Sequence, residues 1–518
     1  MHVTISFAQV FHTDFSPVDS GFHCTNGHFI HKFSTGCGEK HAVIPYLSTK
    51  FCVKPSSRFL YNKSSWGILN IMKKRFSGLT PPQVLTLGFL AIIFVGALIL
   101  TLPISHQQGV HISFMDALFT AVSATAITGL TVVNTATTWS LFGQIILLIM
   151  IEIGALGFMT FAVLLFAITG QRMDLKARLM AQQALNLRNL ADVKSVLQYV
   201  FSLSAIIQVI GAVLMMPDFI PRFGWTHGIY LSIASSISAF GNAGFTFFDE
   251  PVFFLRNDPY ILLVWMLLIS AGSLGFLVWR DLLLFHKQRR LSLHTRVALY
   301  VSAWLTGLGF LFFLFTEKGL APLANSTSIG HRVMDTLFLA VVPRTAGLEV
   351  VPLSSISAAG LMIIMLLMFV GGTPGSTSGG IKTTTLGILW LQSMAALRGQ
   401  ETVNFGGRRF SQKIVIKAMM LAVISSVFVV GVSLLLTITE SIPKGEGLEY
   451  IVFEVISAFS TTGFSMGLTP HLTDFGKVVI MIVMFFGRVG LYTVMFSVMN
   501  IREKPTSFQY PTEEIIIG

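Results

Sequence analysis

The feature that most constrains this chain is a series of about eight apolar stretches, each long enough to cross a membrane as a helix. The hydrocarbon core of a bilayer is roughly 30 Å thick, and a helix needs about 20 apolar residues to span it. Hydrophobic residues make up 53% of the 518 residues and charged residues only 11%, a composition that excludes a soluble globular protein. The spans are predicted at residues 83–103, 141–167, 194–216, 259–283, 297–316, 356–392, 414–438 and 476–499. We therefore expect an all-α polytopic membrane protein with eight transmembrane helices.

Basic residues lie mostly in the short connections between these stretches. The formal net charge of +11 would by itself also suit a protein that binds nucleic acid. Basic side chains in alternate connections instead follow the positive-inside rule, so no nucleic-acid partner is expected. The predicted cytoplasmic connections contain Arg172, Lys176, Arg178, Arg188 and Lys194, then Lys287, Arg289, Arg290 and Arg296, then Arg398, Arg408, Arg409 and Lys413. Basic residues also flank the first and last spans, which predicts that both termini are cytoplasmic.

Residues 1–71 precede the membrane region and differ from it in composition. They contain the only cysteines of the sequence, Cys24, Cys37 and Cys52, and about half of its histidines. A zinc site is an alternative for this segment, but the spacing of its candidate ligands matches no paired-ligand pattern. Those ligands would be Cys24, His28, His31, Cys37 and His41. We expect the segment to lie outside the functional unit, either as a disordered extension or because Met72 is the natural start of the protein.

The apolar stretches form four tandem repeats of a helix, a shorter helix that ends at a glycine, and a second helix. The glycines are Gly129, Gly244, Gly347 and Gly463, which by subtraction lie 115, 103 and 116 residues apart. In three repeats a Ser-Ala pair precedes the glycine, beginning at Ser123, Ser238 and Ser457. The shorter helices, predicted at 114–127, 228–242, 331–345 and 449–462, are too brief to cross a bilayer and must re-enter it.

The repeats are expected to surround a pseudo-four-fold central pore. Each contributes an even number of crossings, so all four have the same orientation around an axis normal to the membrane. Re-entrant backbone is tolerated at this depth only where protein buries it or where it lines a water-filled cavity. The predicted boundaries are 72–170, 190–285, 294–394 and 412–500 for repeats one to four, followed by a cytoplasmic tail at 501–518. Asp116 and Asp335 are expected to begin two short helices, where the helix dipole favours a carboxylate.

The four glycine loops have the chemistry of a cation filter. A dehydrated alkali cation exchanges its water shell for oxygen dipoles, which a ring of backbone carbonyls supplies. Glycine lets the backbone turn its carbonyls inward, and Thr128, Thr345 and Thr462 offer hydroxyl oxygens. The candidate filter residues are Thr128, Gly129, Asn242, Ala243, Gly244, Thr345, Ala346, Gly347, Thr462 and Gly463, with Asn242 as the odd member. The alternative is that each glycine serves close helix packing, which we favour less because four glycines recur at matching places.

A polar segment interrupts the second helix of repeat three. The stretch VGGTPGSTSGGIKTTT contains Pro374 and five glycines, which cannot sustain a helix, and it is too polar to face lipid. We expect it to lie in the pore. A phosphate-binding loop is disfavoured by register, since Ile381 stands where lysine is required. A helix kink that serves packing alone is the remaining alternative.

Charged residues also occur within the predicted spans. Arg488 lies in VVIMIVMFFGRVGLYTVMF, and a charge at bilayer depth usually faces a cavity or a partner. A cation that faces the ion path imposes an electrostatic barrier, whereas an arginine bonded only to carbonyls would be structural. Lys382 is a second candidate charge, at the cytoplasmic end of the polar segment. Glu152 is another buried charge, to which the sequence assigns no role.

These motifs resemble the family of bacterial and plant potassium transporters that includes TrkH and KtrB, over roughly residues 76 to 500. The matching segments are SATAITGLTVVNT, SAFGNAGF, VVPRTAGL and SAFSTTGFS, with RTAGL in place of the expected RTAGF. The resemblance is greatest to KtrB subunits of Ktr potassium uptake systems. It implies a pseudosymmetric potassium channel folded from one chain, with potassium held at the carbonyls of one filter glycine per repeat.

The resemblance also implies a gate. In the family an intramembrane loop, here 371–380, blocks the cavity when flux is off, and the arginine, here Arg488, pairs with that loop. The candidate gate residues are Gly371, Gly372, Gly375, Gly379, Gly380, Lys382 and Arg488.

Partners and ions are expected from the same resemblance. KtrB-like proteins work in the bacterial plasma membrane as homodimers, on a separate cytoplasmic ring of KtrA- or KtrC-like subunits that binds nucleotides. The chain is expected to contact membrane lipid, to bind no cofactor, and to take up potassium, with sodium as a candidate activating or symported ion. The alternatives are a secondary transporter with inverted repeats and a membrane enzyme. The sequence shows neither clear inverted halves nor a recurring carboxylate pair or nucleophile motif.

Overall fold

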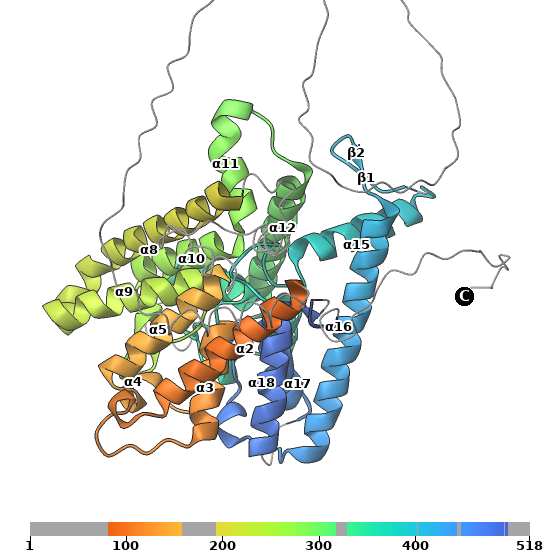
Figure 1. Cartoon of the computed structure of the whole chain (residues 1–518). Coiled ribbons are helices and arrows are strands. Elements are labelled where there is room, and N and C mark those ends of the chain that lie inside the picture. Colours follow the sequence, from red (N-terminus) through yellow and green to blue (C-terminus); the bar gives the residue numbers. More distant parts are fainter. Residues whose placement is uncertain are drawn as a thin grey trace, which may run out of the picture. The chain divides into compact units, whose positions relative to one another are not determined.

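The computed structural model describes residues 81–157, 193–317, 329–400, 402–442, 447–491 and 493–495 (Figure 1). The expected extension at 1–71 with its candidate zinc ligands, the basic residues at 172–188 and the tail at 501–518 lie outside the described residues. The regular secondary structure of the described part is helical apart from a hairpin of β1 (Asn404–Phe405) and β2 (Arg408–Arg409). Its short connecting elements are η1 (Pro103–Ser105), α4 (Thr135–Thr138), η2 (Val252–Asn257), η4 (Val342–Arg344), η5 (Leu353–Ser355) and η6 (Thr469–His471).

The first helix of each repeat is long and apolar enough to cross a membrane by itself. These outer helices are α2 (Pro81–Leu100), α8 (Val193–Phe223), α12 (Leu293–Thr316) and α16 (Gln412–Thr439). Large apolar side chains are exposed along them, such as Phe94 on α2 and Val427 on α16, as a lipid-facing surface requires. Helix α8 extends beyond its predicted end at residue 216 to Phe223. Pro217 and Pro221 lie within its last two turns without ending it.

The second helix of each repeat is short. These re-entrant helices are α3 (Phe114–Ala126), α9 (Trp225–Gly241), α13 (Ile329–Val341) and α17 (Glu449–Ser460). They contain 13, 17, 13 and 12 residues, fewer than a bilayer crossing needs. Ser113 caps α3 by accepting a hydrogen bond from the N–H of Asp116, which lies in the first turn as predicted. The prediction for Asp335 is wrong, because α13 begins at Ile329 and places Asp335 in its second turn.

The third helix of each repeat ends or breaks after 12 to 16 residues. These inner helices are α5 (Leu141–Leu156), α10 (Pro259–Ser273) with α11 (Phe276–Gln288), α14 (Ala358–Phe369) with α15 (Thr383–Leu397), and α18 (Asp474–Val489). The predicted span at 259–283 is broken, since α10 and α11 meet at a bend of 99°. Gly157, Gly275 and Gly490 stand at three of the interruptions with φ values of 81°, 76° and 92°. A positive φ cannot continue an α-helix, and glycine adopts it without steric cost.

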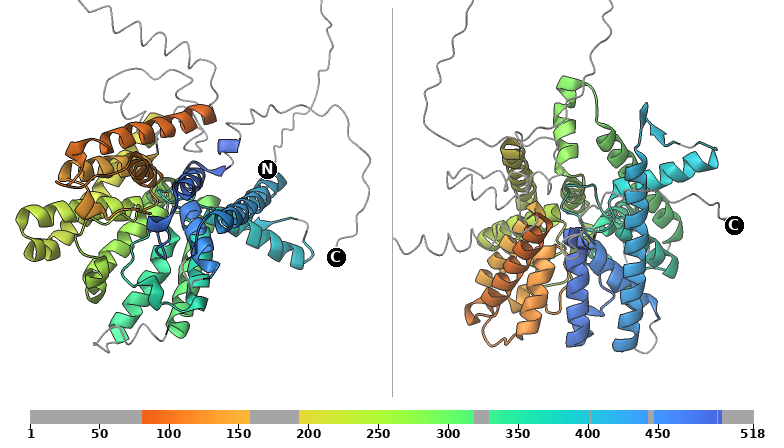
Figure 2. Two further views of the ribbon diagram at one scale, coloured as in Figure 1. Left: turned by 90° about the horizontal axis from the view of Figure 1, so that it is seen from below. Right: turned by 45° about the vertical axis from the view of Figure 1, so that its right-hand side comes forward.

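The four repeats close around one centre. Each inner helix packs against the re-entrant helix of the next repeat: α5 on α9, α10 on α13, α14 on α17, and α18 back on α3. Seen from below, the colours pass from orange through green and teal to blue around this centre (Figure 2, left). Two ion pairs join different repeats, Lys477 to Asp116 at 2.7 Å and Arg256 to Asp335 at 2.9 Å. The predicted all-α fold of four tandem repeats is confirmed.

Candidate functional site

The four repeat glycines meet at the centre of the fold. A methyl group built on Gly129 would lie 2.9 Å from Cα of Gly244, and one on Gly244 would lie 3.5 Å from Cα of Gly347. A methyl on Gly347 would lie 3.0 Å from Cα of Gly463, and one on Gly463 would lie 3.0 Å from Cα of Gly129. The circuit closes in the order of the repeats. We call these four residues the glycine ring.

All four loops share the same unusual backbone conformation. The ring glycines have positive φ values of 88°, 69°, 57° and 91° in repeat order. The residue two positions earlier ends the re-entrant segment and also has positive φ; these residues are Ile127, Asn242, Thr345 and Thr461. Non-glycine residues rarely adopt positive φ, so four matched instances indicate a conformation that the fold imposes.

Backbone carbonyls line the glycine ring. The residue between the two left-handed positions of each loop directs its carbonyl oxygen against the glycine of the preceding repeat. These contacts are Ala243 with Gly129, Ala346 with Gly244, Thr462 with Gly347, and Thr128 with Gly463. A side chain at any ring position would collide with one of these oxygens, so the glycines are required by space as well as by φ.

Serine side chains at the ends of the re-entrant helices hold three of the loops. Ser123 Oγ accepts a hydrogen bond from the N–H of Gly129 at 3.1 Å, and Ser457 Oγ accepts one from Gly463 at 3.1 Å. Ser238 Oγ instead donates to the carbonyl one residue after its glycine, at 2.6 Å. The Ser-Ala pairs of the sequence therefore recur because their serines bind the glycine loops.

The predicted filter residues occupy two different positions. Thr128, Ala243, Ala346 and Thr462 directly precede the ring glycines. Asn242 and Thr345 lie one residue earlier, and their side chains contact the polar segment of repeat three. Asn242 Nδ2 donates to Thr377 Oγ1 at 2.6 Å, and Thr345 Oγ1 donates to Ser378 Oγ at 2.7 Å. The Thr345 hydroxyl is therefore engaged with that segment and is not equivalent to the Thr128 and Thr462 hydroxyls.

The polar segment forms a loop at 371–380 whose base is closed by backbone pairing. The N–H of Gly371 donates to the carbonyl of Ile381 at 2.9 Å. Farther along, the carbonyl of Gly375 accepts from the N–H of Phe276 at 3.0 Å, so the loop fills the break between α10 and α11. A methyl on Gly379 would lie 2.9 Å from the carbonyl oxygen of Ser460. The loop therefore reaches the ends of the re-entrant segments in repeats two, three and four.

Two cationic side chains bind the loop. Arg488 Nη1 donates to the carbonyl of Thr377, while its Nη2 donates to Gly154 at 2.5 Å and Ala155 at 3.3 Å. One guanidinium thus joins the loop of repeat three to the last turn of α5 in repeat one. Lys382 Nζ donates to two carbonyls within the loop itself. The predicted gate residues are therefore brought together in one hydrogen-bonded unit.

This arrangement offers oxygen dipoles rather than fixed negative charge. Within the described ranges, no group of three or more His, Cys, Asp or Glu side chains is placed to hold a metal ion. Carbonyl rings of this kind replace the hydration shell of an alkali cation and still release it. The loop with its two cations contacts residues next to the ring, namely Asn242, Thr345 and Thr461.

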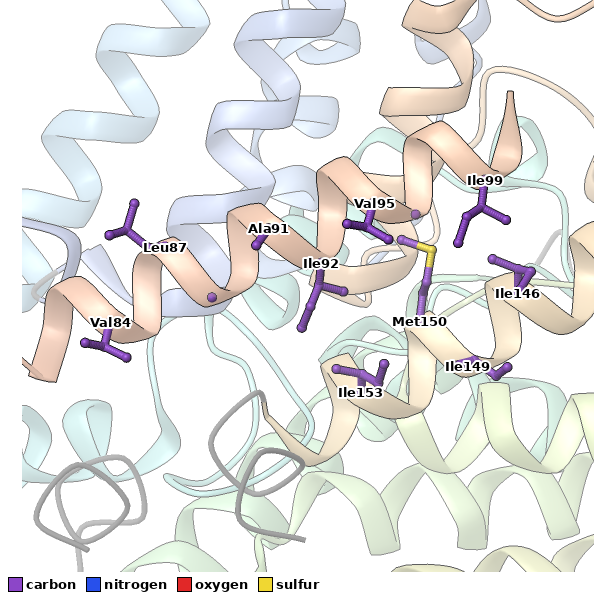
Figure 3. A pocket seen from close by; sticks show the side chains of 12 residues that line it. Val84, Leu87, Ala91, Ile92, Val95, Ile99, Ile146, Ile149, Met150 and Ile153 are labelled. Carbon is purple, nitrogen blue, oxygen red and sulfur yellow. The ribbon is translucent and has the colours of Figure 1, made fainter. Parts of the chain in front are cut away.

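A groove on the outside of repeat one has a different character. It lies between α2 and α5, has a volume of about 500 Å³, and is lined by apolar side chains (Figure 3). Val84, Leu87, Ala91, Ile92, Val95 and Ile99 come from α2, and Ile146, Ile149, Met150 and Ile153 from α5. Its side chains provide no oxygen for a cation, so it is part of the lipid-facing surface rather than of an ion path.

Similarity to known proteins shows which family the chain belongs to. The family model of TrkH, described as a cation transport protein, matches residues 80–510. The chain belongs to the TrkH family. The potassium/sodium uptake protein NtpJ of Enterococcus hirae is 43% identical over 452 residues, which are 87% of this chain and 100% of the relative. The Ktr system potassium uptake protein B of Bacillus subtilis is 38% identical over 445 residues, covering 85% of this chain and 97% of the relative.

A solved structure shares the fold of this TrkH-family chain. The crystal structure of the potassium transporter TrkH from Vibrio parahaemolyticus superposes with a TM-score of 0.64 at 18% identity, covering 82% of this chain and 86% of that one. The family expected from the motifs is therefore confirmed. Members of the TrkH family are cation transport proteins, so the alternative of a membrane enzyme is set aside.

One recurrent sequence signal marks the ends of three inner helices. Glycine pairs three residues apart end three inner helices of this TrkH-family chain: Gly154 with Gly157, Gly272 with Gly275, and Gly487 with Gly490. A methyl on the first member of each pair would collide with a carbonyl of a re-entrant helix, those of Thr125, Phe240 and Phe459 respectively. The second member has positive φ. Each pair thus combines close packing with a helix interruption.

Glu152 has a partner in the described structure. Gln208 Nε2 of α8 donates to Glu152 Oε2 of α5 at 2.9 Å. The bond joins repeat one to repeat two within the apolar region, where a polar group needs a partner. This pairing could not be predicted, because the two residues are 56 positions apart in the chain.

Proposed function

We propose that this TrkH-family chain takes up potassium across the bacterial plasma membrane, with the glycine ring and its carbonyls as the selectivity filter. The closed circuit of the four glycines carries the proposal, because a ring of carbonyl dipoles can replace the water shell of a bare cation. The names of two relatives support potassium as the ion, since one is a potassium/sodium uptake protein and the other a potassium uptake protein.

The loop at 371–380 is the gate of this proposal. Its glycines let the backbone fold closely against three re-entrant segments, and Lys382 binds carbonyls within the loop. Arg488 ties the loop to α5, so the contacts reach all four repeats. Flux then requires that the bond between Arg488 and Thr377 break and that the loop leave the ring.

The subunit organisation is proposed from the relatives. The Bacillus subtilis relative is named as a component of a Ktr system, which supports a separate regulatory subunit for this chain. We take that subunit to be a cytoplasmic nucleotide-binding ring, on which this chain sits as a homodimer with both termini cytoplasmic. Sodium in the name of the Enterococcus hirae relative supports sodium as an activating or symported ion.

The filter is tested by adding a side chain to the ring. Gly129→Ser should lower the preference for potassium over sodium roughly tenfold, the equivalent of about 1.4 kcal/mol, because serine disfavours the positive φ and displaces the Ala243 carbonyl. Paired potassium and sodium fluxes in proteoliposomes measure the effect. Gly307→Ala is the matched control, since Gly307 lies on α12 with no atom within 4 Å of an added methyl. Preserved selectivity after substitution of each ring glycine in turn would exclude the filter.

A further inference from the structure

Repeat four contains a buried carboxylate that the ion pathway described above does not use. Glu454 lies in the re-entrant helix α17 and is 0% exposed to solvent. Burying a carboxylate away from water is costly unless hydrogen bonds replace its hydration. An apolar residue would fill the same volume at lower cost. The partners of Glu454 therefore indicate what the residue does.

The partners of Glu454 all lie just beyond the fourth ring glycine. Ser465 Oγ donates to Glu454 Oε1 at 2.8 Å, and Thr469 Oγ1 donates to the same oxygen. Ser465 Oγ also accepts the N–H of Gly467 at 3.0 Å. One carboxylate oxygen thus binds two residues, Ser465 and Thr469, of the segment that follows the ring glycine Gly463.

Glu454 and Ser457 bind neighbouring residues of the segment 463–465, called the filter strand below although it is not a β-strand. The two residues lie three positions apart on α17, which places them on the same face of the helix. Ser457 Oγ binds the N–H of Gly463, and Glu454 binds the hydroxyl of Ser465, two residues farther on. Side chains of α17 therefore hold this backbone both at Gly463 and at Ser465.

The other repeats lack this carboxylate. The residue nine positions before the ring glycine is Thr120, Ser235, Phe338 and Glu454 in repeats one to four. Thr120 Oγ1 donates to the carbonyl of Asp116 within its own helix, at 2.8 Å. Carboxylate support of the filter strand is thus particular to repeat four.

We propose that Glu454 is a positioning residue that sets the direction of the Gly463 and Phe464 carbonyls by anchoring Ser465 and Thr469. This inference rests on the proposed filter function. Groups that aim ligand atoms must themselves be held by a second layer of contacts, and a site that is about 1 Å too loose fails even when all its groups are present. Glu454 therefore controls ion preference through the filter strand, without contacting the ion.

The test removes either the acceptor, Glu454, or the two donors, Ser465 and Thr469. Glu454→Leu keeps the volume and loses both hydrogen bonds, Glu454→Gln keeps an acceptor at Oε1, and the double variant Ser465→Ala with Thr469→Val removes the donors. We expect Glu454→Leu and the double variant to lower the potassium-to-sodium flux ratio at least fivefold. Glu454→Gln should stay within about twofold of the wild type, since an amide oxygen accepts the same bonds. Thr120→Val, at the matching position of repeat one, should leave the ratio unchanged.

The potassium-to-sodium flux ratio distinguishes a positioning role of Glu454 from a structural one. A merely structural glutamate would reduce the yield of folded protein and the total flux, while the ratio of the two fluxes stayed at the wild-type value; that result would overturn the inference. If Glu454→Leu does not fold, the double variant alone decides. Gly463→Ser is measured alongside. If Gly463→Ser keeps the wild-type ratio, the filter itself is refuted; if it loses the ratio while the anchor variants keep it, only the role of Glu454 is.

Discussion

Arg488 lies where three carbonyl oxygens converge from two repeats. Its bonds to Gly154 and Ala155 satisfy the last turn of α5, where a helix dipole favours a cation. Its third bond, to Thr377, belongs to the loop. The structural role considered for this arginine and the gating role are therefore compatible, since the same guanidinium caps a helix and holds the loop.

Replacing Arg488 by alanine should raise potassium flux. The variant removes a positive charge beside the proposed path and one charge-assisted bond to the loop, for which a contribution of about 1.5 kcal/mol corresponds to roughly a tenfold change in rate. Flux into proteoliposomes without any partner protein measures it. Arg488→Lys, which keeps the charge but not the forked donors, should give an intermediate flux. An unchanged flux in the alanine variant contradicts the gating role.

Glu349 predicts a dependence on external pH. It lies two residues beyond Gly347, where the other repeats have Thr131, Thr246 and Ser465. Burial raises the pKa of the Glu349 carboxyl, an effect partly offset by a hydrogen bond from the N–H of Leu353 at 3.0 Å. Acidifying the outside therefore neutralises this carboxylate at a higher pH than it would an exposed one.

Uptake from dilute potassium should accordingly weaken in acid. A nearby carboxylate attracts the cation by on the order of 0.5 kcal/mol in water, so its loss should reduce uptake roughly twofold as the pH falls through the raised pKa of Glu349. Glu349→Gln should show the reduced uptake already at neutral pH and lose the acid response. If the glutamine variant retains the full pH response of the wild type, another group is responsible.

At the scale of the helices, the interruptions of the inner helices are the main feature that hydropathy did not reveal. Residues 259–283 remain apolar across the bend, because Leu274, Gly275 and Phe276 are no more polar than their neighbours. The bend depends on a positive φ and on contacts with the loop of repeat three, about 100 residues away. Neither enters a hydropathy argument. The interruption at 371–380 was predictable because its residues are polar.

The bend at Gly275 should be sensitive to a single methyl group. Alanine there must adopt a φ of 76° and would place its Cβ 2.5 Å from Thr373 Oγ1 and 2.9 Å from the carbonyl of Pro374. We expect Gly275→Ala to destabilise the protein by about 1–3 kcal/mol, seen as a lower midpoint of thermal unfolding in detergent. Gly307→Ala, in an ordinary helical position with free space, should be neutral or stabilising by up to about 1 kcal/mol. Equal midpoints for both variants would refute the strain argument.

At the scale of the whole molecule, ion pairs between repeats hold the circuit closed. Arg256 and Asp335 join repeats two and three and are only 9% and 6% exposed as side chains. Asp335→Ala should destabilise the protein by about 3–5 kcal/mol, because it leaves a buried guanidinium without its carboxylate. Asp474→Ala is the control. The Asp474 side chain is 75% exposed and lies 3.8 Å from Lys477, so its loss should cost less than about 1 kcal/mol.

The four-repeat architecture could be predicted because the same short-range sequence signals occur in each repeat. Apolar length marks the spans, and the glycine marks the loops, with a preceding Ser-Ala pair in three repeats. Side-chain pairings across repeats could not be predicted, since Asp335 meets Arg256 and Glu152 meets Gln208 only through the packing of helices. For the same reason, the sequence could not show that the Asn242 and Thr345 side chains contact the loop at 371–380, because these contacts depend on tertiary structure.

One polypeptide supplies every quarter of the glycine ring, and this has a consequence for how such a protein can change over generations. In a pore assembled from four identical chains, any mutation is copied four times and acts as a large step. Here each mutation touches a single quarter once, so the ion preference of the proposed filter can be adjusted in small increments while three quarters keep their original form. Unequal neighbours around the ring are therefore what gradual adaptation of a single gene would leave behind.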